Sequence, residues 1–455
     1  MTEDGAPQPE PEREPQPERE PQPEREPQPE PEPEPQREPR PEPAAGRRGL
    51  GAGVAQAIVR GNSAVVTVLA ILVALLLGAV LIAFSDEHVL STFGYFFAAP
   101  GDTVSAVGNS VASAYGALFR GAIVAPGTLS AWLHGDATAS QALYPISLTL
   151  ADAAPLILAG LSVSIAFRAG LFNIGAQGQI ITGSMLAAYL GFAVQLPIVI
   201  HLIVAIGGGF AGGAAWGWLA GVLKARTGAH EVITTIMLNY IAVSLLSYLL
   251  SNSAYQRPGQ TNQLSKIVPP SGRLPLLAGA ALPLDAGIVL AILAAVACAW
   301  LLDRSTVGFA LKAVGANPDA ARTAGMNVGR TYALVMLIAG GLAGLAGASQ
   351  VLSTSTSYSL TTGANSSLGP NAITVALLGR ARPLGTVLAG LLFGALQAGS
   401  TTMQAVTQTP IDVVTVIQAL IVLFIAAPPL IRGIFRMRGS RSGAEGQALA
   451  KGWNG

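Results

Sequence analysis

Cysteine, histidine and lysine are all rare in this sequence, and each shortage excludes a kind of site. The 455 residues include one cysteine, four histidines and four lysines. The single Cys298 lies inside an apolar run, which excludes both a disulfide within the chain and a thiolate metal cluster. The histidines are scattered, with no HExxH pattern and no close pair, and we expect neither a metal site nor a cofactor.

Charged residues of either sign are also scarce. They make up 11% of the chain, whereas hydrophobic residues make up 51% and the mean hydropathy is +0.51. This composition is typical of a protein in a lipid bilayer and excludes an ordinary soluble domain. The charges are unevenly placed, because the first 45 residues carry 14 acidic residues against 5 arginines, while the remainder carries 21 basic against 11 acidic residues.

The chain has no visible energy source of its own. A phosphate-binding loop ends in Gly-Lys-Ser/Thr, but none of the four lysines follows a glycine. The acidic residues beyond the first 45, Asp152 among them, fall in predicted loops or at the ends of predicted spans, which disfavours ion coupling without excluding it. The sequence contains no TVGYG-like filter, and this absence disfavours an ion channel. We infer a transmembrane pathway that takes its energy from another chain.

The N-terminal segment reads as a disordered tail. Residues 7–43 repeat PQPERE and its variants and hold 15 of the 31 prolines. Such a run cannot bury apolar surface or form a helix, so residues 1–45 should be an extended, polyproline-like arm, followed by a basic juxtamembrane segment at 46–62. A solvated tail without a function and a tether for a partner both remain open. No cleavable secretion signal is recognisable.

Residues 63–435 predict an all-α polytopic membrane protein, since a helix needs about 20 apolar residues to cross the hydrocarbon. A cytoplasmic tail follows at 436–455. We predict ten spans, of which the eighth is short and either broken or extended upstream: 63–85, 151–167, 174–193, 196–222, 231–251, 286–302, 331–353, 371–379, 384–403 and 411–433.

The basic residues orient these spans. With the N-terminus inside, 17 of the 21 basic residues after residue 45 fall on the cytoplasmic side and 4 outside, which agrees with the positive-inside rule. Both termini are then cytoplasmic, and residues 86–150 and 252–285 form outer loops. Glycine is abundant at 53 residues, and runs such as 207–213 and 340–347 predict closely packed helices.

Three polar segments interrupt the apolar spans. The first, residues 160–180, holds Asn173, Gln177 and Gln179, where glycines predict a helix break. Neutral amides bind hydroxyls and heterocycle edges without the desolvation cost of a charge, so these residues suit a neutral polar solute. Arg168 in the same segment is more simply an anchor at the inner face than a ligand contact.

The second segment places Asn239 and Tyr240 within a predicted span. These side chains either form hydrogen bonds between helices or contact a solute. The third, residues 363–385, has a Gly-Pro pair before Asn371, which suggests a helix that begins partway across the membrane.

The loop at 303–330 encodes one short helix with both ends marked. Asn317 suits the N-cap, Pro318 the first helical position, Asp319 the positive end of the helix dipole, and Gly325 a left-handed stop. Such a helix has no core of its own, so it is either a docking element for another protein or an inert solvated connection.

Four strings in this order resemble the permease subunits of bacterial ABC importers for nucleosides, within the wider sugar and branched-chain amino-acid permease group. They are AFRAGLFNIGAQGQ, EVITTIMLNYIA, VGFALKAVGANPDAARTAGMN and GPNAITVALLGRARPLG. The resemblance covers roughly residues 60–435. Such proteins often have NIGAEGQ and NEVI, where this chain has Gln177 and His230, and the missing carboxylate puts a charge-based substrate contact at 177 in doubt.

The resemblance implies a type II-like ABC importer permease of about ten helices, some of them broken, in a bacterial plasma membrane. Its partners would be a second, similar permease, a cytoplasmic ATP-binding subunit and an extracellular lipoprotein that delivers the ligand, with membrane lipid around it and no nucleic acid. The substrate path would include Asn173, Gln177, Gln179, Asn239, Tyr240 and Asn371. The ATPase-coupling residues would be Gly315, Asn317, Pro318, Asp319, Ala320, Ala321, Arg322 and Gly325.

Alternatives remain at this point. A permease for another neutral solute, such as a monosaccharide, would use the same amides. A carrier that works alone is a different class, and a scaffolding membrane protein is a third. Under every one of the transport hypotheses the chain itself is not an enzyme.

Overall fold

The computed structural model describes residues 63–363 and 367–435. The chain divides into two units, 1–50 and 51–455, and all described residues belong to the second. The predicted tail at 1–45, the basic segment at 46–62 and the C-terminal tail at 436–455 therefore lie outside the described residues.

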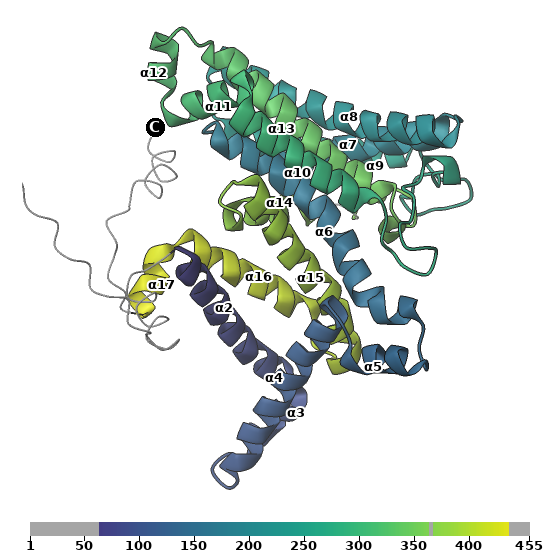
Figure 1. The fold of residues 1–455 in the computed structure, drawn as a ribbon, viewed down its shortest axis with the longest axis vertical. Coiled ribbons are helices and arrows are strands. Elements are labelled where there is room, and N and C mark those ends of the chain that lie inside the picture. The colour runs from purple at the N-terminus through teal and green to yellow at the C-terminus, as the bar shows by residue number, and fades with distance from the viewer. Residues whose placement is uncertain (1–62, 364–366, 436–455) are drawn as a thin grey trace, which may run out of the picture. The chain divides into compact units, whose positions relative to one another are not determined.

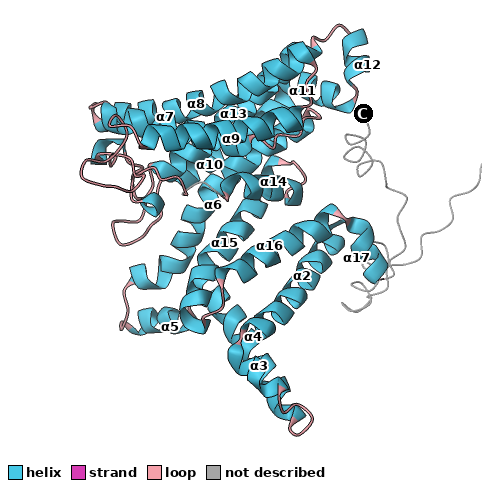
Figure 2. Ribbon diagram, turned by 180° about the vertical axis from the view of Figure 1, so that it is seen from behind, coloured by secondary structure: helices cyan, strands magenta, loops and turns pink. Residues whose placement is uncertain are grey.

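Helices make up the described part of the chain almost entirely, with only isolated bridges between extended segments (Figure 2). Seven helices in this part are long and apolar enough to cross a membrane. They are α2 (Ser63–Ser85), α6 (Ala139–Arg168), α8 (Ile198–Thr227), α9 (Glu231–Leu250), α10 (Gly287–Arg304), α13 (Val328–Val351) and α15 (Pro383–Thr407).

Further helices complete the bundle, and every predicted span coincides with a helix. The remaining predicted spans correspond to α7 (Ala176–Ala193), α14 (Leu368–Leu378) and α16 (Ile411–Ala426) with α17 (Pro428–Ile434). The other elements are α3 (Glu87–Phe93), α4 (Pro100–Ala122), α5 (Pro126–His134), α11 (Thr306–Ala316), α12 (Pro318–Thr323), η1 (Pro270–Gly272) and η2 (Thr354–Thr356). The predicted fold class, an all-α polytopic membrane protein, is confirmed.

The stretch at 86–150, which we predicted to lie outside between the first two spans, contains helices that were not predicted. This stretch contains α3, α4 and α5, and α6 begins at Ala139 rather than at residue 151. A capping box starts α6, since the Thr138 hydroxyl accepts from the Gln141 N–H at 3.4 Å and the Gln141 side chain accepts from the Thr138 N–H at 3.0 Å. As a result Asp152, which we expected at the end of a span, lies near the middle of a 30-residue helix.

Glycine permits the closest helix contacts, as predicted. Along the α8 and α13 pair, a Cβ atom at Gly213 would overlap the carbonyl oxygen of Gly340, and one at Gly344 would overlap that of Gly209. Backbones can approach this closely only without side chains between them, which is how membrane helices gain packing energy where no hydrophobic effect is available.

Helices α6 and α13 are the most buried of the seven long apolar helices; in Figure 1, α13 lies in the upper group of helices and α6 runs from that group towards α5. Their most apolar windows are 78% and 72% buried, against 22% for α9. One apolar core surrounds α6 and includes Ile157, Leu161 and Phe393, whereas a second joins α2, α4, α15 and α16 around Ile417 and Met403. Helix α15 contributes to both cores, because it packs against α6 and also against α4.

Candidate functional site

Helix α12 has the ends that the sequence predicts. The Asn317 Oδ1 accepts hydrogen bonds from the N–H groups of Asp319 and Ala320, each at 3.0 Å, and Pro318 occupies the first helical position. At the other end Gly325 has φ +83°. Its N–H donates to the Arg322 carbonyl and the Met326 N–H donates to the Ala321 carbonyl, both at 3.0 Å. This pair of bonds is a Schellman motif, which stops the helix at a left-handed glycine.

The loop holds two helices, so the expectation of a single one at 303–330 was wrong. Helix α11 precedes α12 and begins where the Ser305 hydroxyl accepts from the Gly308 N–H at 2.9 Å. Its sequence has two glycines, which weaken a helix, but Leu311 and Val314 are fully buried. Burial against the neighbouring helices therefore outweighs the poor intrinsic helix propensity.

Helix α12 is a small exposed knob. Ala321 is its one buried residue, and it packs in a cluster with Val314 and Val328, against which Met326 and Tyr332 also lie. The ion pair between Arg322 and Asp319, at 3.1 Å, joins side chains that are 68% and 89% exposed, so it adds little stability. Nearly all of the surface of α12 is therefore exposed and accessible to another protein.

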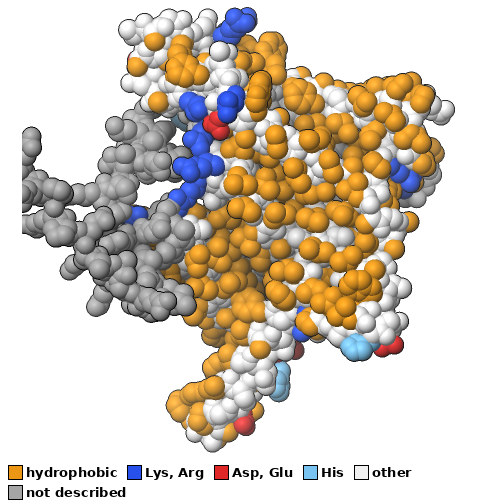
Figure 3. Space-filling model, viewed as in Figure 1, with side chains coloured by type: hydrophobic (Ala, Val, Ile, Leu, Met, Phe, Trp, Pro, Cys, Tyr) orange, Lys and Arg blue, Asp and Glu red, His pale blue; other side chains and the backbone are white. Residues whose placement is uncertain are grey.

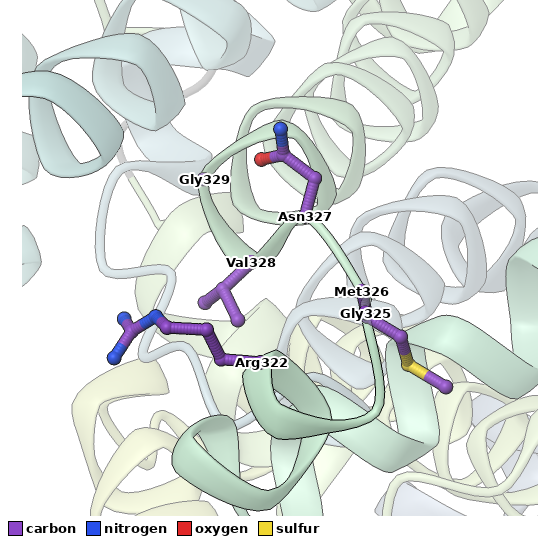
Figure 4. Close-up of a pocket in the computed structure, with 6 residues that line it drawn as sticks. All are labelled: Arg322, Gly325, Met326, Asn327, Val328 and Gly329. Carbon is purple, nitrogen blue, oxygen red and sulfur yellow. The ribbon is translucent and has the colours of Figure 1, made fainter.

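A cavity of about 410 Å³ lies between α12 and the start of α13. It is lined by Arg322, Gly325, Met326, Asn327, Val328 and Gly329. Figure 4 shows the Arg322 and Met326 side chains extending in opposite directions around it. In Figure 3 most of the visible Lys and Arg side chains lie along the edge that carries α12, and apolar side chains cover most of the remaining visible face.

Gly315 joins this loop directly to the bundle. A Cβ atom at Gly315 would overlap the carbonyl oxygen of Arg168, the last residue of α6, and one at Gly170 would lie 3.3 Å from the Gly315 Cα. Arg168 itself donates from Nε to the Ala381 carbonyl at 2.8 Å, as a residue that anchors the helix end would. The backbone of α11, the helix that precedes the knob, is thus in contact with the end of α6.

Beyond Arg168 the chain turns back into the bundle before α7 begins. Gly170 has φ +72° and Gly175 is the N-cap of α7, so the predicted break at these glycines is confirmed. Between them Asn173 is fully buried. It donates to Gln179 Oε1 at 2.9 Å and accepts from Gln179 Nε2 at 3.1 Å, and it also contacts the Ser162 hydroxyl on α6 at 3.4 Å.

Asn239 on α9 holds the broken segment from the other side. Its Oδ1 accepts from the Gly178 N–H at 2.8 Å, and its Nδ2 donates to the Ile174 carbonyl at 3.0 Å. One side chain thereby satisfies a donor and an acceptor that the helix break leaves without helical partners. Hydrogen bonding between elements, one of the two roles expected for Asn239, is present.

Gln177 links α7 to α14, whose 11 residues span about 16 Å, or half of a hydrocarbon layer. Its Oε1 accepts from the Gly369 N–H at 2.8 Å. Asn371 follows on α14 and is partly buried. Tyr240 does not join this group, because it is 67% exposed on the outer side of α9. The structure therefore gathers Asn173, Gln177, Gln179 and Asn239 around two interrupted helices.

Trp216 on α8 was not anticipated from the sequence. Its Nε1 is buried and has no hydrogen-bond partner among the residues that the structure describes. A Cβ atom at Gly178 would lie 3.0 Å from this nitrogen and 2.9 Å from Asn239 Oδ1, which puts the indole N–H at the same junction. The sequence signal was weak, since a tryptophan within a glycine-rich span usually indicates packing.

A family model described as the branched-chain amino acid transport system permease component matches residues 146–426. The guanosine ABC transporter permease NupP of Bacillus subtilis is 39% identical over 327 residues, which cover 71% of this chain and 88% of that protein. The nucleoside ABC transporter permease NupB of Lactococcus lactis is 36% identical, with 62% of this chain and 79% of the relative covered.

A third relative, the glucose ABC transporter permease TsgB13 of Haloferax volcanii, is 33% identical, with 62% of this chain and 76% of the relative covered. No solved structure matches. The matched region runs from the first half of α6 to the end of α16, and it contains both the broken helices and the capped knob. The chain therefore belongs to the family of permease components of branched-chain amino acid transport systems.

Proposed function

We propose that this chain is the permease subunit of an ATP-binding cassette importer for nucleosides. The observation that carries the proposal is the link from α12 through Gly315 to the break between α6 and α7. The exposed helix α12 follows directly after α11, and Gly315 of α11 lies against the backbone at the end of α6, so a push on α12 can pass through α11 to the interior of the bundle. The similarity to guanosine and nucleoside permeases supports the substrate class.

The energy source in this proposal is a separate ATP-binding subunit. The sequence has no Gly-Lys pair for a phosphate loop, so ATP hydrolysis belongs to a partner chain and this subunit is not an enzyme. The residues from Gly315 to Gly325 form the coupling element, with α12 seated in a groove of the ATPase. The excess of basic residues around α12 supports a cytoplasmic location for this end, and for both chain termini, in a bacterial cell.

A second, similar permease completes the pathway. The relatives include two guanosine permeases of Bacillus subtilis, NupP and NupQ, and two nucleoside permeases of Lactococcus lactis, NupB and NupC. Pairs of this kind support a heterodimer of two permeases, to which an extracellular binding lipoprotein delivers the ligand. The exposed Tyr240 face of α9 is then free to meet lipid or the second permease.

In the proposed substrate path most of the amide side chains already form hydrogen bonds within the protein. Asn173, Gln179 and Asn239 form hydrogen bonds in the broken segment between α6 and α7, and Gln177 accepts a hydrogen bond from α14. A passing nucleoside would exchange hydrogen bonds with such groups. Further partners would be Asn371 and the Trp216 N–H, which no described residue accepts from.

A monosaccharide importer is the second candidate, favoured by the similarity to a glucose permease. Uptake by cells that express the complete transporter separates the two. Labelled guanosine should accumulate, and unlabelled uridine or adenosine should compete with it more strongly than glucose does. Accumulation of glucose with no competition from nucleosides would assign the chain to sugar transport instead.

A further inference from the structure

Asp152 is a carboxylate within the most buried membrane helix of the described bundle. It lies 13 residues after Ala139 and 16 residues before Arg168. At 1.5 Å per residue it stands about 24 Å from Arg168, which keeps it inside a hydrocarbon layer of about 30 Å that begins at that arginine. A solute that comes from the membrane face opposite α12 therefore enters the hydrocarbon layer before it reaches Asp152.

The burial pattern of α6 changes at this residue. Asp152 is partly exposed, whereas all residues from 153 to 166 are buried. Gln141, Pro145 and Leu148 precede it at spacings of 11, 7 and 4 residues, so all four share one face of the helix. Asp152 is consequently the innermost accessible position on that face.

The same face opens into a cavity of about 270 Å³, close to the lower end of the range for small-molecule sites, about 300 Å³. Its lining includes Gln141, Tyr144, Pro145 and Leu148 of α6, with Arg120 and Thr402 from the neighbouring helices. Asp152 is not among the lining residues and follows Leu148 by one helical turn on the same face of α6. An amide, a phenol, a guanidinium and a hydroxyl form the polar part of the cavity wall.

No hydrogen bond or ion pair joins Asp152 to any of the residues that the structure describes. A carboxylate in lipid costs several kcal/mol, so such residues face a water-filled path or a bundle interior and mark substrate routes. A helix of this length needs no carboxylate for packing, and α4, α13, α14 and α15 already pack around α6. Asp152 therefore keeps unused hydrogen-bond acceptors on the face of α6 whose earlier turns line the cavity.

We propose that Asp152 is a selectivity contact for the nucleoside as it enters the membrane, accepting two adjacent hydrogen bonds from the ligand. A carboxylate is an acceptor only, and its two oxygens match a pair of neighbouring donors. A guanine base offers such a pair on its N1–H and 2-amino group, and a ribose offers one on its 2′,3′-diol. The inference rests on the proposed function and names the residue that gives it selectivity.

The test compares Asp152→Asn with the wild type in the complete transporter, using guanosine, inosine and 2′,3′-dideoxyguanosine as ligands. Inosine lacks the 2-amino group and the dideoxy compound lacks the diol. The substitution replaces one acceptor by a donor, so guanosine uptake should fall by about tenfold to a hundredfold. The fall should be less than about twofold for whichever analogue already lacks the recognised pair, and this identifies the base or the sugar as the source.

Controls separate recognition from assembly. Asp102→Asn, at an exposed position in the first turn of α4, should leave all three rates unchanged. The ATPase activity of the purified complex without ligand reports assembly, and if Asp152→Asn does not assemble, Asp152→Ser, which also removes the carboxylate, gives the same comparison.

Equal losses for the three ligands would overturn the inference and indicate a structural role or a pairing with the second permease, and so would no loss at all. A wild type that imports none of the nucleosides would refute the proposed function itself, a result distinct from either of these.

Discussion

At the helix breaks of this protein, single side chains form hydrogen bonds with backbone groups that have no helical partner, and Asn239 is the clearest case. Its two hydrogen bonds satisfy the Gly178 N–H and the Ile174 carbonyl, next to an indole N–H that has no partner among the described residues. The sequence predicted the break and the polar residue but not their connection, because hydrogen bonds between residues 61 to 65 positions apart depend on how α9 packs. The hydrogen bonds between Asn173 and Gln179 could not be predicted from the sequence either.

Asn239→Ala should destabilise the bundle by about 1–3 kcal/mol for each buried group left unpaired. We expect a lower thermal midpoint of the purified protein in detergent and slower uptake. Ser244→Ala, at an exposed position on the same helix, is the matched control. An unchanged midpoint for Asn239→Ala would show that the broken segment holds its shape without this side chain.

Asp285 makes stability depend on pH. It is 3% exposed just before α10, and burial raises the pKa of this carboxyl above its usual value of 3.8. A raised pKa in the folded state means that folding favours the protonated form, so this contribution is complete below pH 3.8 and is lost as pH rises through the raised value.

The thermal midpoint of the wild type should therefore fall more steeply in the pH window above about 4 than that of Asp285→Asn. The substituted amide keeps an acceptor for the Gly287 N–H, which Asp285 Oδ1 now binds at 2.8 Å. Parallel curves for the two proteins, recorded by differential scanning fluorimetry, would show that this carboxyl does not titrate in that window.

At the scale of helices, the coupling element shows how far local signals reach. Capping and the left-handed glycine predicted α12 to within a residue, because both are encoded by neighbours in sequence. Helix α11 escaped prediction because the burial of Leu311 and Val314 against other elements stabilises it, not its glycine-containing sequence. The early start of α6 and the presence of α4 escaped for a similar reason, since hydropathy alone does not detect helices with many small polar residues.

Two changes, one in α12 and one at the glycine that ends it, should stop transport without unfolding the bundle. Arg322→Glu alters only an exposed ion pair, so its effect on stability should be small while the charge reversal disrupts docking of the ATPase. Gly325→Val places a β-branched residue at φ +83°, which costs about 1–2 kcal/mol or more and misdirects the end of the helix.

Arg226→Glu, an exposed position beyond the coupling element at the end of α8, serves as the control for charge reversal. Membrane insertion of each variant is checked by quantitative blotting of the membrane fraction. Normal guanosine uptake in both the Arg322→Glu and the Gly325→Val variants would mean that α12 is an inert connection.

At the scale of the whole molecule, the proposed topology places α12 on the cytoplasmic side of the membrane and the 252–285 segment on the outer side. Cys298 is buried and is the only cysteine of the chain, so a Cys298→Ala background allows single new cysteines to be labelled. Thr323→Cys in α12 and Gln260→Cys in the other segment are both at exposed positions.

An impermeant maleimide added to intact cells should label the cysteine at 260 and spare the one at 323 until the cells are opened. The opposite pattern would reverse the topology and place α12 out of reach of any cytoplasmic ATPase. The orientation follows from the basic residues alone, so this experiment tests the positive-inside argument as well.

Guanosine uptake into proteoliposomes, measured with and without the ATP-binding subunit, tests most directly whether the energy for transport comes from that subunit. Vesicles that contain this chain, its second permease, the ATPase and the binding protein should accumulate guanosine only when ATP reaches the ATPase, and vesicles with this chain alone should accumulate none. Uptake by the chain alone, without ATP or a partner, would contradict the coupling role of α12 and identify a carrier that works by itself.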